Sequence, residues 1–474
     1  MDKLATDICI IGAGSGGLTV AAVCSQMGAK VILIERDKMG GECLNSGCVP
    51  SKALIESARH AYAASHANKF GLENTALKAD YKKIAAHIQT VIDSIAPHDS
   101  IERFTKFGVS VIKGYGKFID ENTVQVNDNI ITAKYFVVAT GSAPFIPPID
   151  GLDKTAYFTN ETIFALDKKP KHLICIGGGP IGCELAAAHH SFATAVTIID
   201  AGSILPRDDQ ECVAIVKQRF IDDGITLKEN SKILKVEQID ENIIVTIEIN
   251  GTTEQLTGSH LLVATGRKAN IDYLQLDKAN IDFDRTITVD KRMRTTNLKV
   301  FAIGDSASGP QFTHAASFQA GVVIRNIIFK WPAKINYASL PWCTYINPEL
   351  AHVGLTEQDI KSQRIKYRTI KVSFSENDRA QADHATDGII KAIIAKNGKI
   401  LGVDIVGPHA GELISLWSFA IANGLKIKAM ANFIAPYPTL NEISKRVASE
   451  YYASSLYSNW MRFIVKILMR FVKI

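Results

Sequence analysis

Short apolar runs alternate with longer helix-like patterns along most of the chain, and one order of elements occurs twice. An apolar strand leads into a glycine-rich turn, a helix and a second apolar strand that ends in an acidic residue. The first copy reads DICIIGAGSGG, LTVAAVCSQMG and KVILIE, and the second reads HLICIGGGPIG, CELAAAHHSFA and AVTIID. Because strands that alternate with helices form parallel βαβ units, the pattern predicts an α/β fold.

Both glycine-rich turns carry the spacing Gly-x-Gly-x-x-Gly, and in each copy an acid follows the first glycine by 23 positions. In such a motif the first glycine makes a tight turn, the second lets the backbone approach a pyrophosphate, and the third lets the helix pack on the strand. The acid accepts ribose hydroxyls. Two such sites in one chain predict two dinucleotides that exchange electrons. The residues are Gly12, Gly14 and Gly17 with Glu35, and Gly177, Gly179 and Gly182 with Asp200.

Three further apolar strands end in small polar motifs. They are FVVATG at 136–141, LLVATG at 261–266 and VFAIGD at 300–305. An acid at the carboxyl end of a strand, such as Asp305, is well placed to accept a ribityl hydroxyl. A helix cap or a turn is the alternative interpretation of that aspartate.

Composition narrows the class of protein. A chain of 474 residues is too long for one core, and 47 % hydrophobic with 21 % charged residues is typical of a soluble α/β protein. A formal charge of +5 is too small and too evenly spread to predict nucleic-acid binding. The first residues do not read as a signal peptide, and eight scattered cysteines do not read as a secreted disulfide scaffold. We therefore expect a cytoplasmic protein, in which a disulfide is more often catalytic than structural.

The stretch GGECLNSGCVPSK holds two cysteines, Cys43 and Cys48, five positions apart. Pro50 suits the first turn of a helix, so Cys48 is expected at the helix N-terminus, where the dipole lowers a thiol pKa. Cys43 is expected on irregular backbone before that helix. A zinc site lacks a second ligand pair, and a structural disulfide around so short a loop would constrain little. A reversible redox pair is the favoured interpretation, and the other six cysteines read as core residues.

These motifs, in this order, resemble the class I pyridine nucleotide–disulfide oxidoreductases, the family of lipoamide dehydrogenase, glutathione reductase and mercuric reductase. The resemblance extends to about Tyr452 and includes PWCTYINPELAHVGLTE of the dimerisation domain. It implies two Rossmann-like dinucleotide-binding domains, for FAD and NAD, plus a C-terminal α+β dimerisation domain in a homodimer. The implied domains are 1–150 and 281–336 for FAD, 151–280 for NAD and 337–452 for dimerisation, followed by a basic helix at 453–474.

The resemblance also implies roles for single residues. Cys48 would lie next to the flavin and Cys43 would attack the substrate, while Lys52 and Glu184 would form a pair beside the flavin ring. The FAD-binding residues would be Gly12, Gly14, Gly17, Glu35, Lys52, Gly116, Thr140, Gly141, Ser142 and Asp305. The NAD-binding residues would be Gly177, Gly179, Gly182, Asp200 and Gly266, and no resident metal is expected.

Two features bear on the substrates. Asp200 would accept a free 2′-hydroxyl and repel a 2′-phosphate, which favours NAD over NADP, although Arg207 follows seven positions later. In lipoamide dehydrogenase and glutathione reductase a histidine of the partner subunit acts as base, oriented by a glutamate five residues on. Here IAPYPTLNEISKR puts Tyr437 at the base position with Glu442 after it. A phenol with a pKa near 10 is a poor substitute for an imidazole.

The favoured function is therefore an NADH-linked, FAD-dependent disulfide oxidoreductase nearest to dihydrolipoamide dehydrogenase, acting on a small thiol or disulfide. Alternatives are a mercuric-reductase-like enzyme or a membrane-associated flavoprotein that serves a quinone. The second alternative comes from the final segment, in which Arg462, Lys466, Arg470 and Lys473 form one stripe on an otherwise apolar helix. Such a helix can lie in a membrane interface or cover another apolar surface.

Overall fold

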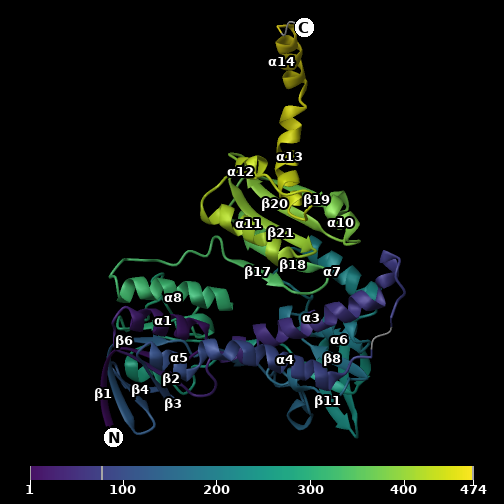
Figure 1. Cartoon of the computed structure of the whole chain (residues 1–474). Helices are drawn as coiled ribbons and strands as arrows, with labels where there is room; N and C mark the ends of the chain where they lie inside the picture. The colour runs from purple at the N-terminus through teal and green to yellow at the C-terminus, as the bar shows by residue number, and fades with distance from the viewer. Residues whose placement is uncertain (1, 76–77, 472–474) are drawn as a thin grey trace. The chain divides into compact units, whose positions relative to one another are not determined.

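The computed structural model describes residues 2–75 and 78–471 (Figure 1). The chain forms two compact units, which we describe separately. Unit 1 comprises Met1–Ser203 and Lys228–Asn336, and unit 2 comprises Ile204–Leu227 and Tyr337–Ile474. Both units combine helices and sheets, so the predicted α/β class is confirmed.

The larger sheet of unit 1 has seven strands in the order β3-β2-β1-β6-β5-β4, with β16 also paired to β6. The strands β1, β2, β3, β6 and β16 run parallel, and the β4–β5 ribbon is antiparallel. Their bounds are Asp2–Ile11, Val31–Glu35, Val109–Lys113, Lys117–Asp120, Thr123–Val126, Asn129–Val138 and Val300–Ala302 for β1 to β6 and β16. Helices α1 (Ser15–Gln26) and α8 (Thr313–Ile327) pack together against this sheet, and their apolar residues join one core with it (Figure 1).

A second sheet of unit 1 contains β9, β8 and β14 in that order, and a third is the antiparallel ribbon β11-β12-β13. In the second sheet β8 runs parallel to both β9 and β14. A short antiparallel pair, β7 with β15, accompanies them. The bounds of β7 to β15 are Ser142–Pro144, His172–Ile176, Ala195–Ile199, Thr226–Lys228, Lys232–Ile239, Asn242–Ile249, Thr252–Gly258, His260–Val263 and Arg267–Ala269.

The remaining helices of unit 1 follow the glycine turns or connect the strands. They are α2 (Gly41–Asn45), α3 (Cys48–Ser65), α4 (Tyr81–Ile95), α5 (Ile101–Lys106) and α6 (Pro180–Ser191). Helices α1 and α6 follow the two glycine turns, as the repeated pattern predicts, but they begin inside the motifs, directly after Gly14 and Gly179.

Unit 2 is built on a five-stranded antiparallel sheet in the order β17-β18-β21-β20-β19 (Figure 1). These strands are Pro341–Thr344, Glu349–Gly354, Ile400–Gly407, Ile389–Ala395 and Tyr367–Ser373 in that spatial order. Helix α11 packs on β18 and β21, and its buried Trp417 lies in the core that the sheet shares with α13. The helices are α7 (Gln210–Asp223), α9 (Glu357–Ser362), α10 (Asp378–Ala382), α11 (Ala410–Ala422), α12 (Ile427–Asn432), α13 (Glu442–Leu456) and α14 (Asn459–Arg470).

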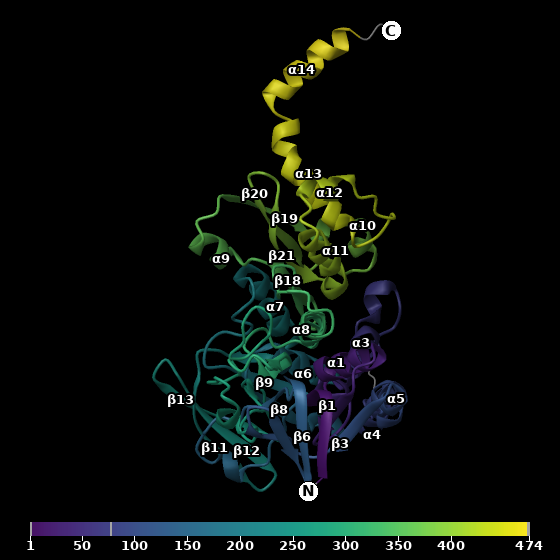
Figure 2. The same cartoon turned by 90° about the vertical axis from the view of Figure 1, so that its left-hand side faces the viewer.

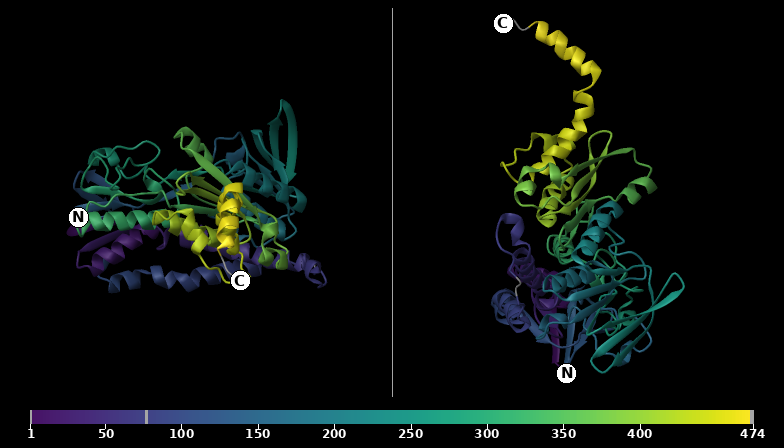
Figure 3. Two further views of the ribbon diagram at one scale, coloured as in Figure 1. Left: turned by 90° about the horizontal axis from the view of Figure 1, so that it is seen from above. Right: turned by 90° about the vertical axis from the view of Figure 1, so that its right-hand side faces the viewer.

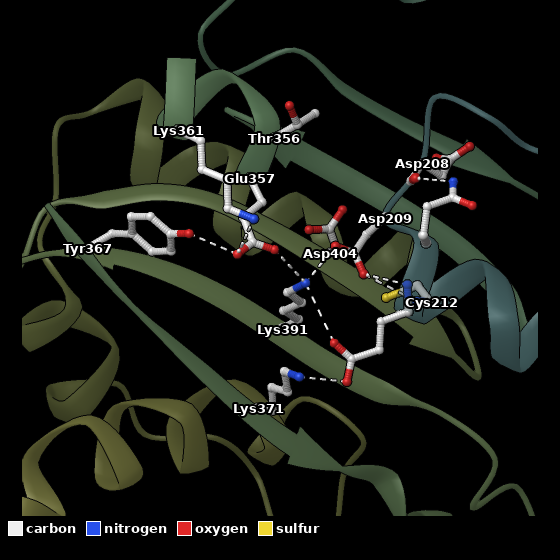
Figure 4. Close-up of polar contacts among 12 residues, drawn as sticks. Asp208, Asp209, Cys212, Thr356, Glu357, Lys361, Tyr367, Lys371, Lys391 and Asp404 are labelled. Carbon is white, nitrogen blue, oxygen red and sulfur yellow. Dashed lines mark hydrogen bonds and ion pairs between the residues drawn. The ribbon is translucent and has the colours of Figure 1, made fainter. Parts of the chain in front are cut away.

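Helix α7 lies within the range predicted for NAD binding, yet it belongs to unit 2. The physical reason is an ion-pair network around Lys391 of β20, whose side chain is 5 % exposed (Figure 4). Its ammonium group lies 2.6 Å from Asp209, the N-cap of α7, and 3.2 Å from Glu357 of α9. Glu211 lies 3.6 Å away and also pairs with Lys371 of β19. Because Lys391 and Asp209 are largely removed from water, their ion pair ties α7 to the sheet of unit 2.

Within residues 2–75 and 78–471, none of the helices combines the length and the hydropathy that a segment crossing a bilayer requires.

Candidate active site

The glycine loop between β1 and α1 has the geometry that its spacing predicts. Gly12 has φ of +108°, and a Cβ atom there would lie 2.3 Å from the carbonyl oxygen of Ala139. A Cβ atom on Gly17 would lie 2.0 Å from the carbonyl oxygen of Gly12. By contrast, a Cβ atom on Gly14 would meet nothing within 4 Å. Gly12 and Gly17 are therefore required by backbone packing, whereas Gly14 borders open space beside a helix N-terminus that suits a pyrophosphate.

The loop between β8 and α6 repeats this geometry. A Cβ atom on Gly177, whose φ is +109°, would lie 2.3 Å from the carbonyl oxygen of Ala264. One on Gly182 would lie 1.9 Å from the carbonyl oxygen of Gly177, and one on Gly179 would meet nothing within 4 Å. Gly266, with φ of +134°, also borders open space. The second loop is thus a second place for a dinucleotide pyrophosphate.

The two acids that follow the glycine loops accept hydrogen bonds from the loop backbone. The spacing of these residues in the sequence does not reveal this contact. Glu35 accepts hydrogen bonds from the backbone N–H groups of Ala13 at 2.6 Å and Asp37 at 2.7 Å. Asp200 accepts equivalent bonds from Gly178 and Gly202, both at 2.7 Å. Each carboxylate oxygen keeps a further lone pair for a ribose hydroxyl, so one acid can hold both the loop and the ligand.

A pocket beside Glu35 suits the adenine end of FAD. Its lining includes Gly116, as the resemblance implies, and also Arg36, Tyr115 and Tyr273, which the sequence analysis missed. The Arg36 guanidinium lies 5.8 Å from the centre of the Tyr115 ring and 5.4 Å from that of Tyr273. Flat aromatic and guanidinium groups of this kind stack on an adenine. The only sequence signal is the position of Arg36 directly after the acid.

The residues expected around the rest of the flavin also lie together. Thr140 carries a buried hydroxyl without a hydrogen-bond partner among the described residues. Its neighbour Gly141, with φ of +65°, borders open space. The Ser142 hydroxyl donates to Asp305 at 2.5 Å. An unsatisfied buried hydroxyl calls for a ligand, so this region and the first glycine loop fit FAD.

An ion-pair network links the region around Ser142 and Asp305 to residues 40–52, which contain the two cysteines and are called the redox stretch below. Arg267 lies 3.3 Å from Asp305 and donates to the Ser142 hydroxyl at 2.7 Å. The same guanidinium donates through two nitrogens to the carboxylate of Glu42, at 2.6 Å for the longer bond. Glu42 also accepts a bond from Asn160 at 2.7 Å. Cys43 is thus preceded by a residue that is tied to the expected flavin site through one arginine.

The two cysteines lie on adjacent helices. Cys48 is the first residue of α3, as predicted, but Cys43 lies on α2, so the prediction of irregular backbone was wrong. A turn through Ser46 and Gly47 separates α2 from α3, and it allows the two thiols to meet although they are five positions apart. Gly41 is needed before Cys43 because a Cβ atom there would lie 2.7 Å from the Cα atom of Gly14. The redox stretch therefore contacts the first glycine loop directly.

The pKa values of the two thiols are shifted in opposite directions. The hydrogen bond from Cys43 and one with Thr313, at 3.3 Å, together with the charge of Lys52, lower the pKa of Cys48 to about 6. The hydrogen bond to Cys48, together with burial, raises the pKa of Cys43 far above its ordinary value. Both cysteines are free thiols here. The pair therefore holds one thiolate, on Cys48, with Cys43 as its donor.

This difference predicts the pH dependence of alkylation. The thiolate is the nucleophile, so Cys48 is expected to react with iodoacetamide at a rate that rises with pH around a midpoint near 6. Peptide mapping by mass spectrometry after timed labelling would locate the modification. Thr313→Val should move the midpoint upward because it removes one bond to the thiolate. A midpoint near the ordinary value of 9 for Cys48 would contradict the assignment.

Lys52 and Glu184 form the pair that the resemblance implies. The Lys52 ammonium lies 2.8 Å from a carboxylate oxygen of Glu184, and the Glu184 side chain is 8 % exposed. Glu184 is in the first turns of α6 and Lys52 is in the first turns of α3. The pair joins the helix of the redox stretch to the helix of the second glycine loop within unit 1.

Tyr437 and Glu442 belong to unit 2 and do not form a dyad. The Tyr437 hydroxyl donates to Asp378 at 3.0 Å, and the side chain is 72 % exposed. Glu442 instead accepts a bond from the backbone N–H of Thr439 at 3.3 Å. The hydrogen bond to Asp378 raises the pKa of Tyr437 above its ordinary value of 10. This tyrosine is therefore even less able to act as a base at neutral pH.

Comparisons with known proteins agree with this geometry. The model of the pyridine nucleotide-disulphide oxidoreductase family matches residues 6–320, and the model of the family's dimerisation domain matches residues 340–448, which supports a homodimer. A mercuric reductase of Lysinibacillus sphaericus is 34 % identical over 93 % of this chain and 82 % of its own. A dihydrolipoyl dehydrogenase of Geobacillus stearothermophilus is 34 % identical over 94 % of this chain and 95 % of its own.

Solved structures give the same result. LpdA of Mycobacterium tuberculosis matches with a TM-score of 0.86 and 25 % identity over 94 % of this chain and 99 % of its own. The copper(II) complex of the HOCl-induced flavoprotein disulfide reductase RclA of Escherichia coli matches with a TM-score of 0.85 and 25 % identity, over 95 % and 99 %. Together with the paired glycine loops and the redox cysteines, these matches show that the chain belongs to the FAD-dependent pyridine nucleotide–disulphide oxidoreductase family.

Proposed function

We propose that the protein is an NADH-linked disulfide oxidoreductase with the activity class of dihydrolipoyl dehydrogenase. The observation that supports it most strongly is the pair of hydrogen-bonded thiols on α2 and at the start of α3, in which the pKa of Cys48 is lowered and that of Cys43 is raised. The net reaction would be NADH, a proton and a disulfide giving NAD⁺ and a dithiol, or its reverse. Bound FAD would supply the two-electron chemistry that connects the nicotinamide with the cysteine pair.

The chain's own residues would do the exchange chemistry. Cys43, once deprotonated, would attack a sulfur of the substrate disulfide, and the first substrate thiol would leave. The Cys48 thiolate would then attack Cys43, which forms the Cys43–Cys48 disulfide and releases the second substrate thiol. Lys52 would support the Cys48 thiolate by its charge. Since Tyr437 is a poor base, deprotonation of Cys43 is the step in which this chain departs from enzymes that use a histidine.

NADH is expected to be preferred over NADPH. The carboxylate of Asp200 is fixed at the end of the second loop by two backbone bonds, where it would repel a 2′-phosphate. We expect kcat/KM to be at least about tenfold higher with NADH, equivalent to about 1.4 kcal/mol of binding discrimination. Stopped-flow measurement of flavin bleaching with each nucleotide would test this, and equal rates would contradict it.

Reduction of a soft metal ion is the second candidate. A tyrosine at the base position is the observation that favours it, since transfer of electrons to a metal ion releases no substrate thiolate that must take up a proton from an acid–base residue. Two thiolates bind Hg²⁺ or copper well. A relative named mercuric reductase and a related reductase solved with copper(II) support the same class of substrate.

One experiment separates the candidates. The holoenzyme would be reduced anaerobically with NADH and then mixed with lipoamide, glutathione disulfide, Hg²⁺, Cu²⁺ or a quinone in turn. The proposal predicts fast reoxidation by a disulfide, with stoichiometric thiol production. Reoxidation by a metal ion alone would replace it with the second candidate, and reoxidation by the quinone alone would overturn both.

The cytoplasmic location expected from the cysteine usage is a separate prediction, which this experiment does not address.

A further inference from the structure

The C-terminal helix α14 lacks a buried face. Eight of its twelve residues are apolar, three are basic and one is asparagine, and none of the twelve is buried. Trp460 is 69 % exposed, Phe463 is 55 % exposed and Leu468 is 59 % exposed. Figures 1 and 2 and the right-hand view of Figure 3 show α14 projecting beyond the end of α13, away from the sheet of unit 2. This apolar face therefore needs an occupant that the single chain does not supply.

Helix α14 is a separate element with its own N-terminus. Helix α13 ends at Leu456, and the Ser458 hydroxyl accepts a hydrogen bond from the backbone N–H of Met461 at 3.3 Å. An N-cap of this kind lets a helix start in a new direction. Its twelve residues span about 18 Å, well short of the ~30 Å apolar core of a bilayer.

The cations of α14 lie on one narrow stripe. Arg462, Lys466 and Arg470 recur every four residues, so they drift by about 40° per step and cover about 80° of the helix circumference. Apolar side chains cover most of the remaining circumference, including the stacked rings of Trp460 and Phe463, whose centres are 6.2 Å apart. An apolar arc this wide exceeds the two positions in seven that a helix–helix seam uses.

The charge of this segment identifies the occupant. After Glu450 the sequence contains four cations and not a single aspartate or glutamate. Within the described residues, Arg462, Lys466 and Arg470 take part in none of the ion pairs found. A second copy of the same helix would add further cations and supply no carboxylate to pair with them. An anionic lipid surface supplies both apolar depth and negative charge.

We propose that α14 is a membrane-interface anchor, lying parallel to an anionic bilayer with Trp460, Phe463 and Leu468 at the acyl boundary and its cations at the lipid phosphates. This adds an interaction surface to the redox function and does not rest on the choice of substrate. The anchor would hold the enzyme reversibly at a lipid surface, because one short helix buries too little for permanent insertion.

Vesicle flotation of the full-length holoenzyme tests the anchor. We expect binding to phosphatidylcholine vesicles that contain about 30 % phosphatidylserine, and much weaker binding to pure phosphatidylcholine. The triple variant R462Q/K466Q/R470Q should bind the anionic vesicles about a hundredfold more weakly. The matched control K78Q/K82Q/K83Q removes three cations from the segment around the start of α4 and should bind like the wild type.

A fluorescence measurement places the helix independently. Anionic vesicles should shift Trp emission to shorter wavelength, and the shift should vanish in W460F but persist in W331F, since Trp331 is similarly exposed at 62 %. Absence of vesicle binding by the wild type would overturn the proposal, as would equal binding by R462Q/K466Q/R470Q. A change of oligomeric state in F463S/L468S would assign the apolar face to a second copy instead.

Discussion

Cys48→Ser is expected to abolish NADH-driven reduction of any disulfide, with a fall in kcat of at least about 10³-fold, because the thiolate is the group that closes the Cys43–Cys48 bond. Reduction of bound FAD by NADH should survive, since the residues of the second glycine loop are unchanged. Steady-state disulfide reduction and single-turnover flavin bleaching, measured on the same preparation, separate these two steps.

Two further variants make the result specific. Cys43→Ser should lose disulfide reduction to the same degree, because the two thiols act as one unit. Cys343→Ser changes a partly exposed thiol in unit 2 and should leave both reactions unchanged. Retention of more than a tenth of disulfide turnover by Cys48→Ser would show that electrons reach the substrate without this pair.

Lys391→Met is expected to destabilise unit 2 by about 3–5 kcal/mol, because it leaves the largely buried carboxylate of Asp209 without its counter-ion. Urea denaturation followed by Trp fluorescence would measure this, since the core of unit 2 contains the buried Trp417. The pH dependence has a defined sign. The hydrogen bond from Tyr367, together with Lys391, lowers the pKa of Glu357 to about 2. Its stabilising effect is therefore present above its ordinary pKa of 4.5 and is lost as the pH falls toward 2.

Lys371→Met is the matched control for this network. Lys371 pairs with Glu211 at 2.6 Å, but its side chain is 48 % exposed. Exposed ion pairs contribute little, so we expect a loss of at most about 1 kcal/mol. Equal losses in the two lysine variants would mean that burial of Lys391 has no energetic consequence. The difference between the two variants should also shrink as the pH falls from 4.5 toward 2, the range over which the stabilising effect of Glu357 is lost.

Local patterns were sufficient to predict the framework of unit 1. The repeat of strand, glycine turn and helix predicts both loops, because a side chain would clash with nearby backbone in each loop. Gly17 packs against the carbonyl oxygen of Gly12, and Gly182 packs against that of Gly177. The position of Cys48 followed in the same way from Pro50. These features depend on a few neighbouring residues, and the sequence carries that information directly.

Contacts between distant residues could not be read in the same way. Glu42 and Arg267 are 225 positions apart, and neither one lies in a motif that requires the other. The tyrosine at the base position bonds Asp378 rather than Glu442, the residue that orients the base in the enzymes that the chain resembles. The pairing of Lys52 with Glu184 came from family resemblance, not from periodicity. Such contacts depend on how separate elements pack, which hydrophobic patterning does not encode.

The bonds from Glu35 and Asp200 to their own loops have a consequence for assembly. Each loop is already held by its acid before any nucleotide arrives, so little conformational entropy is left to lose upon binding. We therefore expect both glycine loops to keep their conformation in the apoprotein. FAD would then bind to a preorganised site and would not be needed to fold it. Loss of the cofactor would then be a reversible event in the life of the enzyme, repaired by simple re-binding.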